Sequence, residues 1–246
     1  MLTTLILAGG MGSRLGDLTR VVPKPLVEIC GKPISLHLVD YLQKFKIYNF
    51  IFAVGYKKEK FHKFFKELFN QSLDIEYNLK NPNGFARKNI YEQANFRLID
   101  TGLYNQTGSR IAQVFDLIDE DIILCTYGDG LANVDINLLL ETHYRNKTSI
   151  TITAVTSPAR FGGMEIKEDK VLSFSEKKPI QGNWINGGFM VISREFRNKY
   201  LNKEEDCILE NMPLEKAAQE KDLGVYKHFD FWQCMDTPRD HKYLEN

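Results

Sequence analysis

The chain has 246 residues, 43% of them hydrophobic, which is enough for a substantial core and, in the α/β class, for a single domain over residues 1–246. Its 32 Lys and Arg residues balance 32 Asp and Glu residues, so the formal net charge is zero. This balance excludes the broad basic field by which nucleic-acid-binding proteins attract phosphate backbones, and any basic site must be local.

In the first half of the chain, apolar runs of strand length alternate with amphipathic stretches. Strands are expected over residues 2–8, 50–54 and 121–126, and helices over 34–45 and 57–69. This alternation predicts a largely parallel sheet with helices on both faces, which is an α/β sandwich. Residues 79–95, with mixed polarity, are expected to form a long loop or lid.

From about residue 148 the pattern changes to closely spaced strands. These strands are expected over residues 148–156, 163–167, 171–175 and 185–192. A polar, helix-forming stretch over 204–221 follows, then a strand near 224–229 and a short terminal helix. We expect this half to extend the same sheet and to add a small extra β region.

Neither the cysteines nor the histidines are spaced for metal binding or nucleophilic catalysis. The four cysteines lie far apart, as is typical of reduced structural thiols: Cys30, Cys125, Cys207 and Cys234. The five histidines show neither metal-ligand nor triad spacing: His37, His62, His143, His228 and His241. The N-terminus has no basic leader, and no apolar run approaches the ~20 residues needed to cross a bilayer. We therefore expect a cytoplasmic protein without a membrane segment.

A glycine-rich loop follows the first expected strand. Gly9, Gly10 and Gly12 allow the backbone to approach a ligand closely, with amide hydrogens directed at phosphate oxygens. The spacing fits neither G-x-x-x-x-G-K-S/T nor G-x-G-x-x-G. The glycines alone are also consistent with a tight turn, but Arg14 and Lys24 add the charge that a polyphosphate requires. The loop is therefore a candidate anion site.

Two aspartates, far apart in sequence, are candidate metal ligands. Asp129 directly follows the strand expected over 121–126, and the carboxyl ends of parallel strands are where open α/β sheets bind ligands. Asp236 lies in Met235-Asp-Thr-Pro238, which could equally be a simple helix cap. Because Mg²⁺ takes only one or two protein carboxylates and fills its other positions with water and phosphate oxygens, this pair would suffice if the fold brings it together.

Read jointly, these segments resemble the sugar-nucleotide pyrophosphorylases, and more closely their glucose-1-phosphate cytidylyltransferase branch. The resemblance covers about residues 2–244, and its most specific part is Leu7-Ala-Gly-Gly-Met-Gly-Ser-Arg-Leu15 followed by Pro23-Lys-Pro25. The branch is indicated by Asp100-Thr-Gly102, Thr107-Gly-Ser-Arg110, Tyr127-Gly-Asp-Gly130, Arg160-Phe-Gly162, Trp184-Ile-Asn-Gly-Gly-Phe189 and Phe231-Trp-Gln-Cys-Met-Asp-Thr237. Related thymidylyltransferases carry Leu-Gly-Asp-Asn in place of Tyr127-Gly-Asp-Gly130, which favours CTP.

The resemblance assigns roles to residues at matching positions. It implies catalytic roles for Arg14, Lys24, Asp129 and Lys177, and a shared Mg²⁺ for Asp129 and Asp236. It implies nucleotide binding by Leu7, Ala8, Gly9, Gly10, Gly12, Ser13, Arg14, Lys24, Thr107, Arg110 and Gly128, with Thr107 and Arg110 beside the cytidine. It implies sugar phosphate binding by Glu176, Lys177, Asn186 and Gly187.

The resemblance also implies a fold and a reaction. The fold would be the Rossmann-like nucleotide-diphospho-sugar transferase fold, a mixed and mostly parallel sheet flanked by helices. Residues 1–130 would mainly bind the nucleotide and residues 131–246 the sugar phosphate. The reaction would transfer CMP from CTP to a sugar 1-phosphate, with α-D-glucose 1-phosphate as the favoured acceptor. Its products would be pyrophosphate and a CDP-sugar for polysaccharide synthesis. A homo-oligomer is also implied.

Two departures from the family pattern concern the sugar side. The family's Glu-Lys-Pro is here Glu176-Lys-Lys-Pro179, so either Lys177 or Lys178 could face the sugar phosphate. Cys234 stands where relatives usually carry Pro. A nucleotide-sensing, non-catalytic relative would be expected to lack Asp129 or Asp236, and both are present. An enzyme of the same fold acting on another phosphate, such as an alditol phosphate, remains an alternative.

Overall fold

The protein is built around one eight-stranded sheet, shown by a computed structural model that describes residues 2–69, 76–78, 93–156, 163–167, 170–175 and 184–246. In spatial order the strands are β13 (Leu223–His228), β9 (Ile150–Thr156), β12 (Trp184–Ser193), β7 (Ile122–Tyr127), β1 (Thr3–Leu7), β4 (Asn49–Val54), β6 (Asn95–Asp100) and β5 (Glu76–Asn78). Smaller pairs are β2 (Glu28–Ile29) with β3 (Lys32–Pro33), β8 (Gly130–Ala132) with β14 (Trp232–Cys234), and β10 (Gly163–Lys167) with β11 (Lys170–Ser175).

Strand direction decides where the carboxyl ends meet. Strands β7, β1, β4 and β6 are neighbours and run parallel, so all four end at one edge of the sheet. Strand β12 runs antiparallel between β7 and β9, and β5 is antiparallel to β6. The expectation of a mixed, mostly parallel sheet is therefore confirmed.

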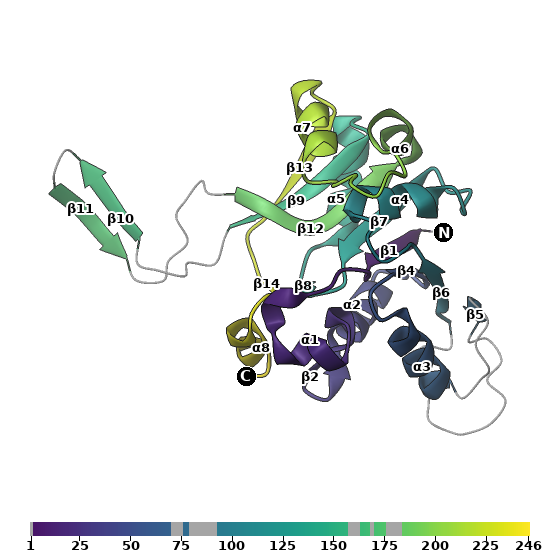
Figure 1. Ribbon diagram of the computed structural model, residues 1–246. Helices are drawn as coiled ribbons and strands as arrows, with labels where there is room; N and C mark the ends of the chain where they lie inside the picture. The colour runs from purple at the N-terminus through teal and green to yellow at the C-terminus, as the bar shows by residue number, and fades with distance from the viewer. Residues whose placement is uncertain (1, 70–75, 79–92, 157–162, 168–169, 176–183) are drawn as a thin grey trace.

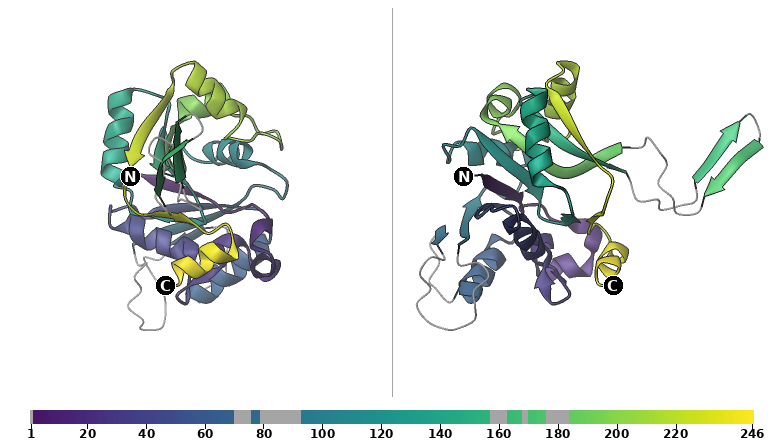
Figure 2. Two further views of the ribbon diagram at one scale, coloured as in Figure 1. Left: turned by 90° about the vertical axis from the view of Figure 1, so that its left-hand side faces the viewer. Right: turned by 180° about the vertical axis from the view of Figure 1, so that it is seen from behind.

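Helices cover both faces of this sheet because the strand residues are apolar on both sides. In β1, Ile6 packs on one face, and Leu5 and Leu7 on the other. The first face is covered by α2 (Ile34–Gln43), α3 (Lys58–Phe69) and α5 (Ile136–Asn146), and the second by α4 (Thr107–Phe115), α6 (Arg194–Tyr200) and α7 (Met212–Gln219). Figure 1 shows α6 and α7 above the strands and α2 and α3 below them, and the left view of Figure 2 shows helices on either side of the sheet.

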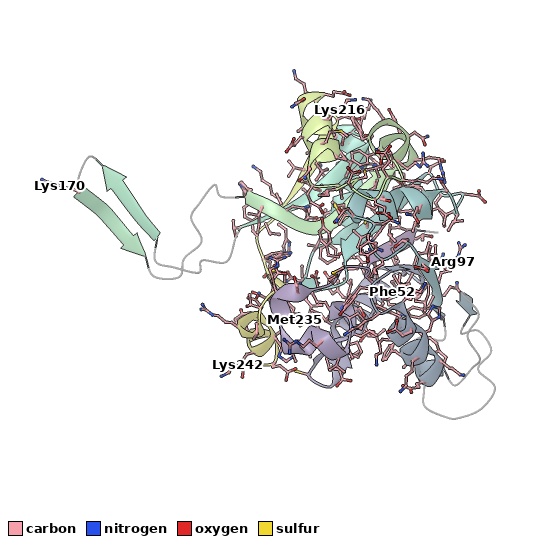
Figure 3. All side chains as sticks on the ribbon, viewed as in Figure 1. Phe52, Arg97, Lys170, Lys216, Met235 and Lys242 are labelled. Atoms are coloured by element: carbon pink, nitrogen blue, oxygen red, sulfur yellow. The ribbon has the colours of Figure 1, made fainter. Side chains whose placement is uncertain are left out.

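A separate small core attaches the C-terminal segment to the first part of the chain. Met235 is fully buried and clusters with Leu15, Val27, Ile29 and Ile34. Figure 3 shows Met235 beside the purple N-terminal ribbon, between β14 and α8 (Pro238–Leu244). The same N-terminal segment carries the short helices η1 (Ser13–Leu15), α1 (Asp17–Val21) and η2 (Lys24–Leu26). This packing places the residue after Met235 next to the glycine-rich loop.

The strands of the second half follow the expectation, and two other expectations differ from the structure or fall outside the description. Strands β9, β12 and β13 join the sheet, and β10 and β11 form a two-stranded hairpin of their own, the small extra β region expected in this half (Figure 1). The helix expected over 204–221 is only α7, because Pro213 is accepted in a first helical turn and not in a helix interior. Most of the loop expected over 79–95 lies outside the described residues, and Asn95 is the first residue of β6. Among the described helices, none has both the length and the apolar character needed to cross a bilayer.

Asp222 ties the start of β13 to the start of β9. Its carboxylate accepts hydrogen bonds from the Ser149 backbone amide and hydroxyl, both at 2.7 Å, and from the Tyr200 hydroxyl at 3.0 Å. Burial would raise the pKa of Asp222, but the Ser149 and Tyr200 hydrogen bonds and the Lys199 charge outweigh it and hold that pKa below its usual value.

We predict that Asp222→Asn lowers the free energy of unfolding at pH 7 by about 1–3 kcal/mol. Because the folded-state pKa is depressed, this stabilisation is present above the unfolded carboxyl pKa of about 4 and is lost as the pH falls through the folded-state value. Urea unfolding at pH 7 and at acidic pH measures the difference, with Asp206→Asn, at an exposed position, as control. Equal stability of wild type and Asp222→Asn at pH 7 would contradict the assignment.

Candidate active site

The sheet edge at which the parallel strands end carries a cleft of about 300 Å³. Its walls come from the segments that follow β1, β6 and β7, together with the start of η2 and α4. The lining residues are Leu7, Ala8, Gly9, Gly10, Gly12, Arg14, Lys24, Pro25, Asn105, Gln106, Thr107, Arg110, Tyr127 and Asp129. Ten of these fourteen are residues to which the sequence assigned a catalytic, nucleotide or metal role.

The glycine-rich loop turns directly out of β1 and folds back on Lys24. Gly12 has φ 63°, in the left-handed region that favours glycine, and a Cβ there would lie 3.1 Å from the Lys24 Cβ. The Thr19 hydroxyl donates to the carbonyls of Gly12 at 3.0 Å and Gly16 at 3.2 Å, which closes the turn. The loop therefore holds its shape through its own hydrogen bonds and lies against the Lys24 side chain.

Lys24 bridges the two aspartates that the sequence singled out. Its ammonium lies 2.5 Å from the Asp129 carboxylate and 2.6 Å from that of Asp236. The largely exposed Arg14 guanidinium approaches the second Asp236 oxygen at 3.2 Å. The fold thus brings Asp129 and Asp236 together at the Lys24 ammonium, beside the glycine-rich loop.

Backbone pairing produces this convergence. Asp129 stands between β7 and β8, and β8 pairs antiparallel with β14, so that Gly130 faces Cys234. The Met235 amide donates to the Asp129 carbonyl at 2.9 Å, which fixes Asp236 directly after that contact. Lys24 opens η2, where it is buried beneath the loop. Three segments distant in sequence are held by two short strands and one buried methionine.

The electrostatics of the junction favour charged side chains. Burial would lower the pKa of Lys24, but the charges and hydrogen bonds of Asp129 and Asp236 outweigh it and raise that pKa. Burial would raise the pKa of Asp236, but the Lys24 hydrogen bond and the Lys24 and Arg14 charges lower it. Lys24 and Asp236 therefore both favour their charged forms.

The donor set fits a divalent cation that shares its coordination with phosphate. The two carboxylates already converge on the Lys24 ammonium, and a pair of converging carboxylates is what such a cation needs from the protein. In the part of the chain that the structure describes, no group of three or more His, Cys, Asp or Glu side chains could hold a metal ion by itself. A cation held by this pair would thus depend on phosphate oxygens and water for its other ligands.

Arg110 lies at the back of the cleft and is only 4% exposed. Its guanidinium donates to the Gly9 carbonyl at 3.1 Å, the Gly102 carbonyl at 2.9 Å and the Thr101 hydroxyl at 2.5 Å. These contacts join the glycine-rich loop to the segment after β6. In this structure Arg110 supports the loop, while its role beside cytidine stays a prediction.

A carboxylate that the sequence did not single out lies at the rim. Glu210 accepts hydrogen bonds from the Tyr127 hydroxyl and, at 2.7 Å, from the Thr107 hydroxyl. Thr107 also accepts from the Leu209 amide at 2.9 Å. Burial and the nearby Glu210 charge raise the pKa of Tyr127, so its hydroxyl remains a donor. Glu210 could not be found from sequence because an isolated exposed glutamate carries no local signal.

The predicted sugar-side residues lie at an irregularity in β12. Pairing of β12 with β9 shifts between Asn186 and Met190, and the Asn186 side chain accepts from the Gly188 amide at 2.9 Å. The Trp232 indole donates to the Gly187 carbonyl at 2.7 Å, which attaches β14 to this bulge. Gly188 packs directly on the Tyr127 ring. Asn186 and Gly187 are therefore connected to the cleft through Tyr127.

The other predicted residues differ in position. Ser13 is exposed on η1, and Gly128 is buried with its amide donating to the Leu7 carbonyl at 3.0 Å; neither is among the residues that line the cleft. Glu176, Lys177 and Lys178 lie outside the described residues.

A larger hollow, about 930 Å³, lies at the opposite edge, where β1, β4 and β6 begin. It contains none of the predicted residues. The candidate site is therefore identified by its place at the carboxyl ends of the parallel strands, and not by the volume of the hollow.

We predict that Gly9→Ala destabilises the ligand-free protein by about 1–3 kcal/mol, because the new methyl group would collide with the buried Arg110 guanidinium. Gly10→Ala is the matched control, since a Cβ at Gly10 would meet nothing within 4 Å. Thermal unfolding of both variants without ligand measures the difference. Equal destabilisation by the two substitutions would contradict the role of Arg110 in supporting the loop.

Comparisons with known proteins show which family the chain belongs to. The sequence pattern described as nucleotidyl transferase matches residues 3–238. The chain is 37% identical over 242 residues to the glucose-1-phosphate cytidylyltransferase of Salmonella typhimurium, covering 98% of this chain and 93% of that protein. It is 34% identical to a protein of Bacillus subtilis named probable glucose-1-phosphate cytidylyltransferase, over 95% of this chain and 91% of that one.

Solved structures support the fold. HddC from Yersinia pseudotuberculosis, complexed with GMP-PN, superposes with a TM-score of 0.68 over 100% of this chain and 98% of that chain, at 22% identity. At this identity the likeness concerns the fold alone. The sequence pattern and the Salmonella relative span nearly the whole chain, which confirms the resemblance inferred from the motifs. The chain belongs to the nucleotidyl transferase family.

Proposed function

We propose that this protein transfers CMP from CTP to α-D-glucose 1-phosphate, giving CDP-glucose and pyrophosphate. The observation that carries the proposal is the convergence of Asp129, Asp236 and Lys24 beside a glycine-rich loop at the carboxyl edge of the sheet. The choice of CTP and glucose 1-phosphate is supported by the two cytidylyltransferase relatives. A related transferase acting on a different sugar or non-sugar phosphate is the alternative.

The reaction is an in-line displacement in which the protein mainly positions charge. An oxygen of the sugar phosphate attacks the α-phosphorus of CTP, the bond from that phosphorus to the bridging oxygen breaks, and pyrophosphate departs on the opposite side. The attacking phosphate is already ionised, so no general base is needed. The polar cleft must align the two phosphates and disperse their negative charge.

The residues of the cleft divide this work. Amides of Gly9, Gly10 and Gly12 receive the nucleotide phosphates, and Arg14 and Lys24 balance the charge of the departing pyrophosphate. Asp129 and Asp236 would hold a divalent cation, for which we propose Mg²⁺. Such a cation, when bound, neutralises phosphate oxygens and orients the reacting groups.

The sugar phosphate is assigned to the side of the cleft bounded by the β12 bulge. Asn186 and Gly187 stand there, connected to Tyr127 on one side and Trp232 on the other. Glu176 and Lys177 are proposed to complete this side, with Lys178 as the alternative to Lys177. The division into a nucleotide part over residues 1–130 and a sugar part over 131–246, a homo-oligomeric state and a cytoplasmic location are parts of the same proposal.

The substrate assignment is tested by pyrophosphate release from each of the common nucleoside triphosphates paired with each of several sugar 1-phosphates, with Mg²⁺. We expect CTP with glucose 1-phosphate to give the highest kcat/KM. Release with CTP and a non-glucose phosphate would favour the alternative acceptor, and release only with another nucleotide would contradict the assignment to CTP.

Asp129→Asn is expected to lower kcat by about a hundredfold or more. It removes one of the two carboxylates proposed to hold the cation that neutralises the reacting phosphates. Asp135→Asn is a matched control, because Asp135 caps α5 and does not line the cleft. Steady-state kinetics and thermal unfolding are measured for both. A stable Asp129→Asn protein with near-normal kcat would remove Asp129 from the mechanism.

A further inference from the structure

The Lys24 ammonium stands where the two proposed metal ligands converge. It touches Asp129 at 2.5 Å and Asp236 at 2.6 Å, and its side chain is 10% exposed. The two carboxylates are 26% and 19% exposed, so all three groups are partly withdrawn from water. With Arg14 also on Asp236, two positive charges face two negative charges, and the junction is electrically balanced without any ion.

This balance disfavours a divalent cation in the nucleotide-free protein. A cation that bound both carboxylates would have to displace the ammonium or lie against it. Like charges a few ångströms apart repel far more strongly in a partly buried site than in water. Lys24 is therefore a competitor for the cation.

Polyphosphate offers Lys24 a second partner within the same cleft. Lys24 and the loop residues Gly9, Gly10 and Gly12 line one cavity. Its stem is fixed, because the Lys24 Cβ and Cδ pack under Gly12, but the ammonium sits at the end of a flexible chain. A phosphate bound to the loop amides can accept the ammonium after a rotation of this side chain, and the carboxylates are then free.

We propose that Lys24 is an internal counter-ion that occupies the place of the divalent cation until nucleotide phosphate draws it away, so that cation binding is coupled to nucleotide binding. The inference rests on the proposed function in taking Asp129 and Asp236 as the cation's ligands. Because coupling is reciprocal, the cation also strengthens nucleotide binding by releasing Lys24. The cation thus enters with the nucleotide and binds the free protein weakly.

The test measures Mn²⁺ affinity of the full chain without nucleotide, from the electron paramagnetic resonance signal of free Mn²⁺. Lys24→Met should bind Mn²⁺ about tenfold or more tightly than wild type, because the competing charge is gone. Lys24→Arg keeps a cation and should stay near wild type. Lys58→Met is the matched control for net charge, since Lys58 pairs with Asp100 away from the junction.

Asp129→Asn tests whether the additional Mn²⁺ affinity of Lys24→Met arises at the two aspartates. In the Lys24→Met background, Asp129→Asn should abolish the gain in Mn²⁺ affinity. Equal affinity of wild type and Lys24→Met, or an equal gain in Lys58→Met, would overturn the proposal.

If Lys24→Met does not fold, the proposal is tested by comparing the Mn²⁺ affinities of wild type and Asp129→Asn, both of which keep Lys24. Wild type should bind Mn²⁺ no more tightly than Asp129→Asn when nucleotide is absent. Clearly tighter binding by wild type overturns the proposal.

These outcomes are separate from those of the substrate screen. The probe is Mn²⁺ alone, so a failed release of pyrophosphate from CTP would leave a measured gain in Lys24→Met intact. Conversely, an active cytidylyltransferase whose wild-type form binds Mn²⁺ tightly would refute the counter-ion role and leave the function standing.

Discussion

The bridge from Lys24 to Asp129 and Asp236 is the contact on which the organisation of the cleft depends. It joins the start of η2, beneath the glycine-rich loop, to the end of β7 and to the C-terminal segment, three parts of the chain that are distant in sequence. Removing one partner from a partly buried ion pair leaves the others uncompensated, so the three residues form one electrostatic unit. The pairing of β8 with β14 and the burial of Met235 hold that unit in register.

Behind this unit, Arg110 plays a second structural part. A buried guanidinium with several carbonyl and hydroxyl partners fixes the backbone at the base of the glycine-rich loop and after β6. The loop amides can therefore be oriented before any phosphate arrives, which reduces the ordering that binding would otherwise require. A rigid loop beside a lysine that can change its partner is the physical basis of the proposed coupling between nucleotide and cation.

The rim of the cleft includes a residue that belongs to none of the sequence motifs. Tyr127 directly precedes the Gly-Asp-Gly segment, but its hydroxyl bonds to Glu210, a residue from the segment that sequence periodicity assigned to a helix. Helix propensity over 204–221 was overridden because the segment before Pro213 packs on α4, with the Leu209 amide on Thr107 and the Cys207 carbonyl accepting from Ser109. Contacts of this kind depend on pairs of residues about a hundred positions apart.

The sequence by itself determined the fold class and the loop that follows the first strand, and it singled out Asp129 as a candidate, because strand periodicity, glycine spacing and a carboxylate after a strand are local signals. It also carried the family resemblance, through motifs spread along the chain. Only the tertiary structure decided that Lys24 lies between the aspartates, that Arg110 is buried, and that β10 and β11 leave the main sheet. The physical reason is that each of these depends on strand pairing and burial between distant segments, which local sequence patterns do not encode.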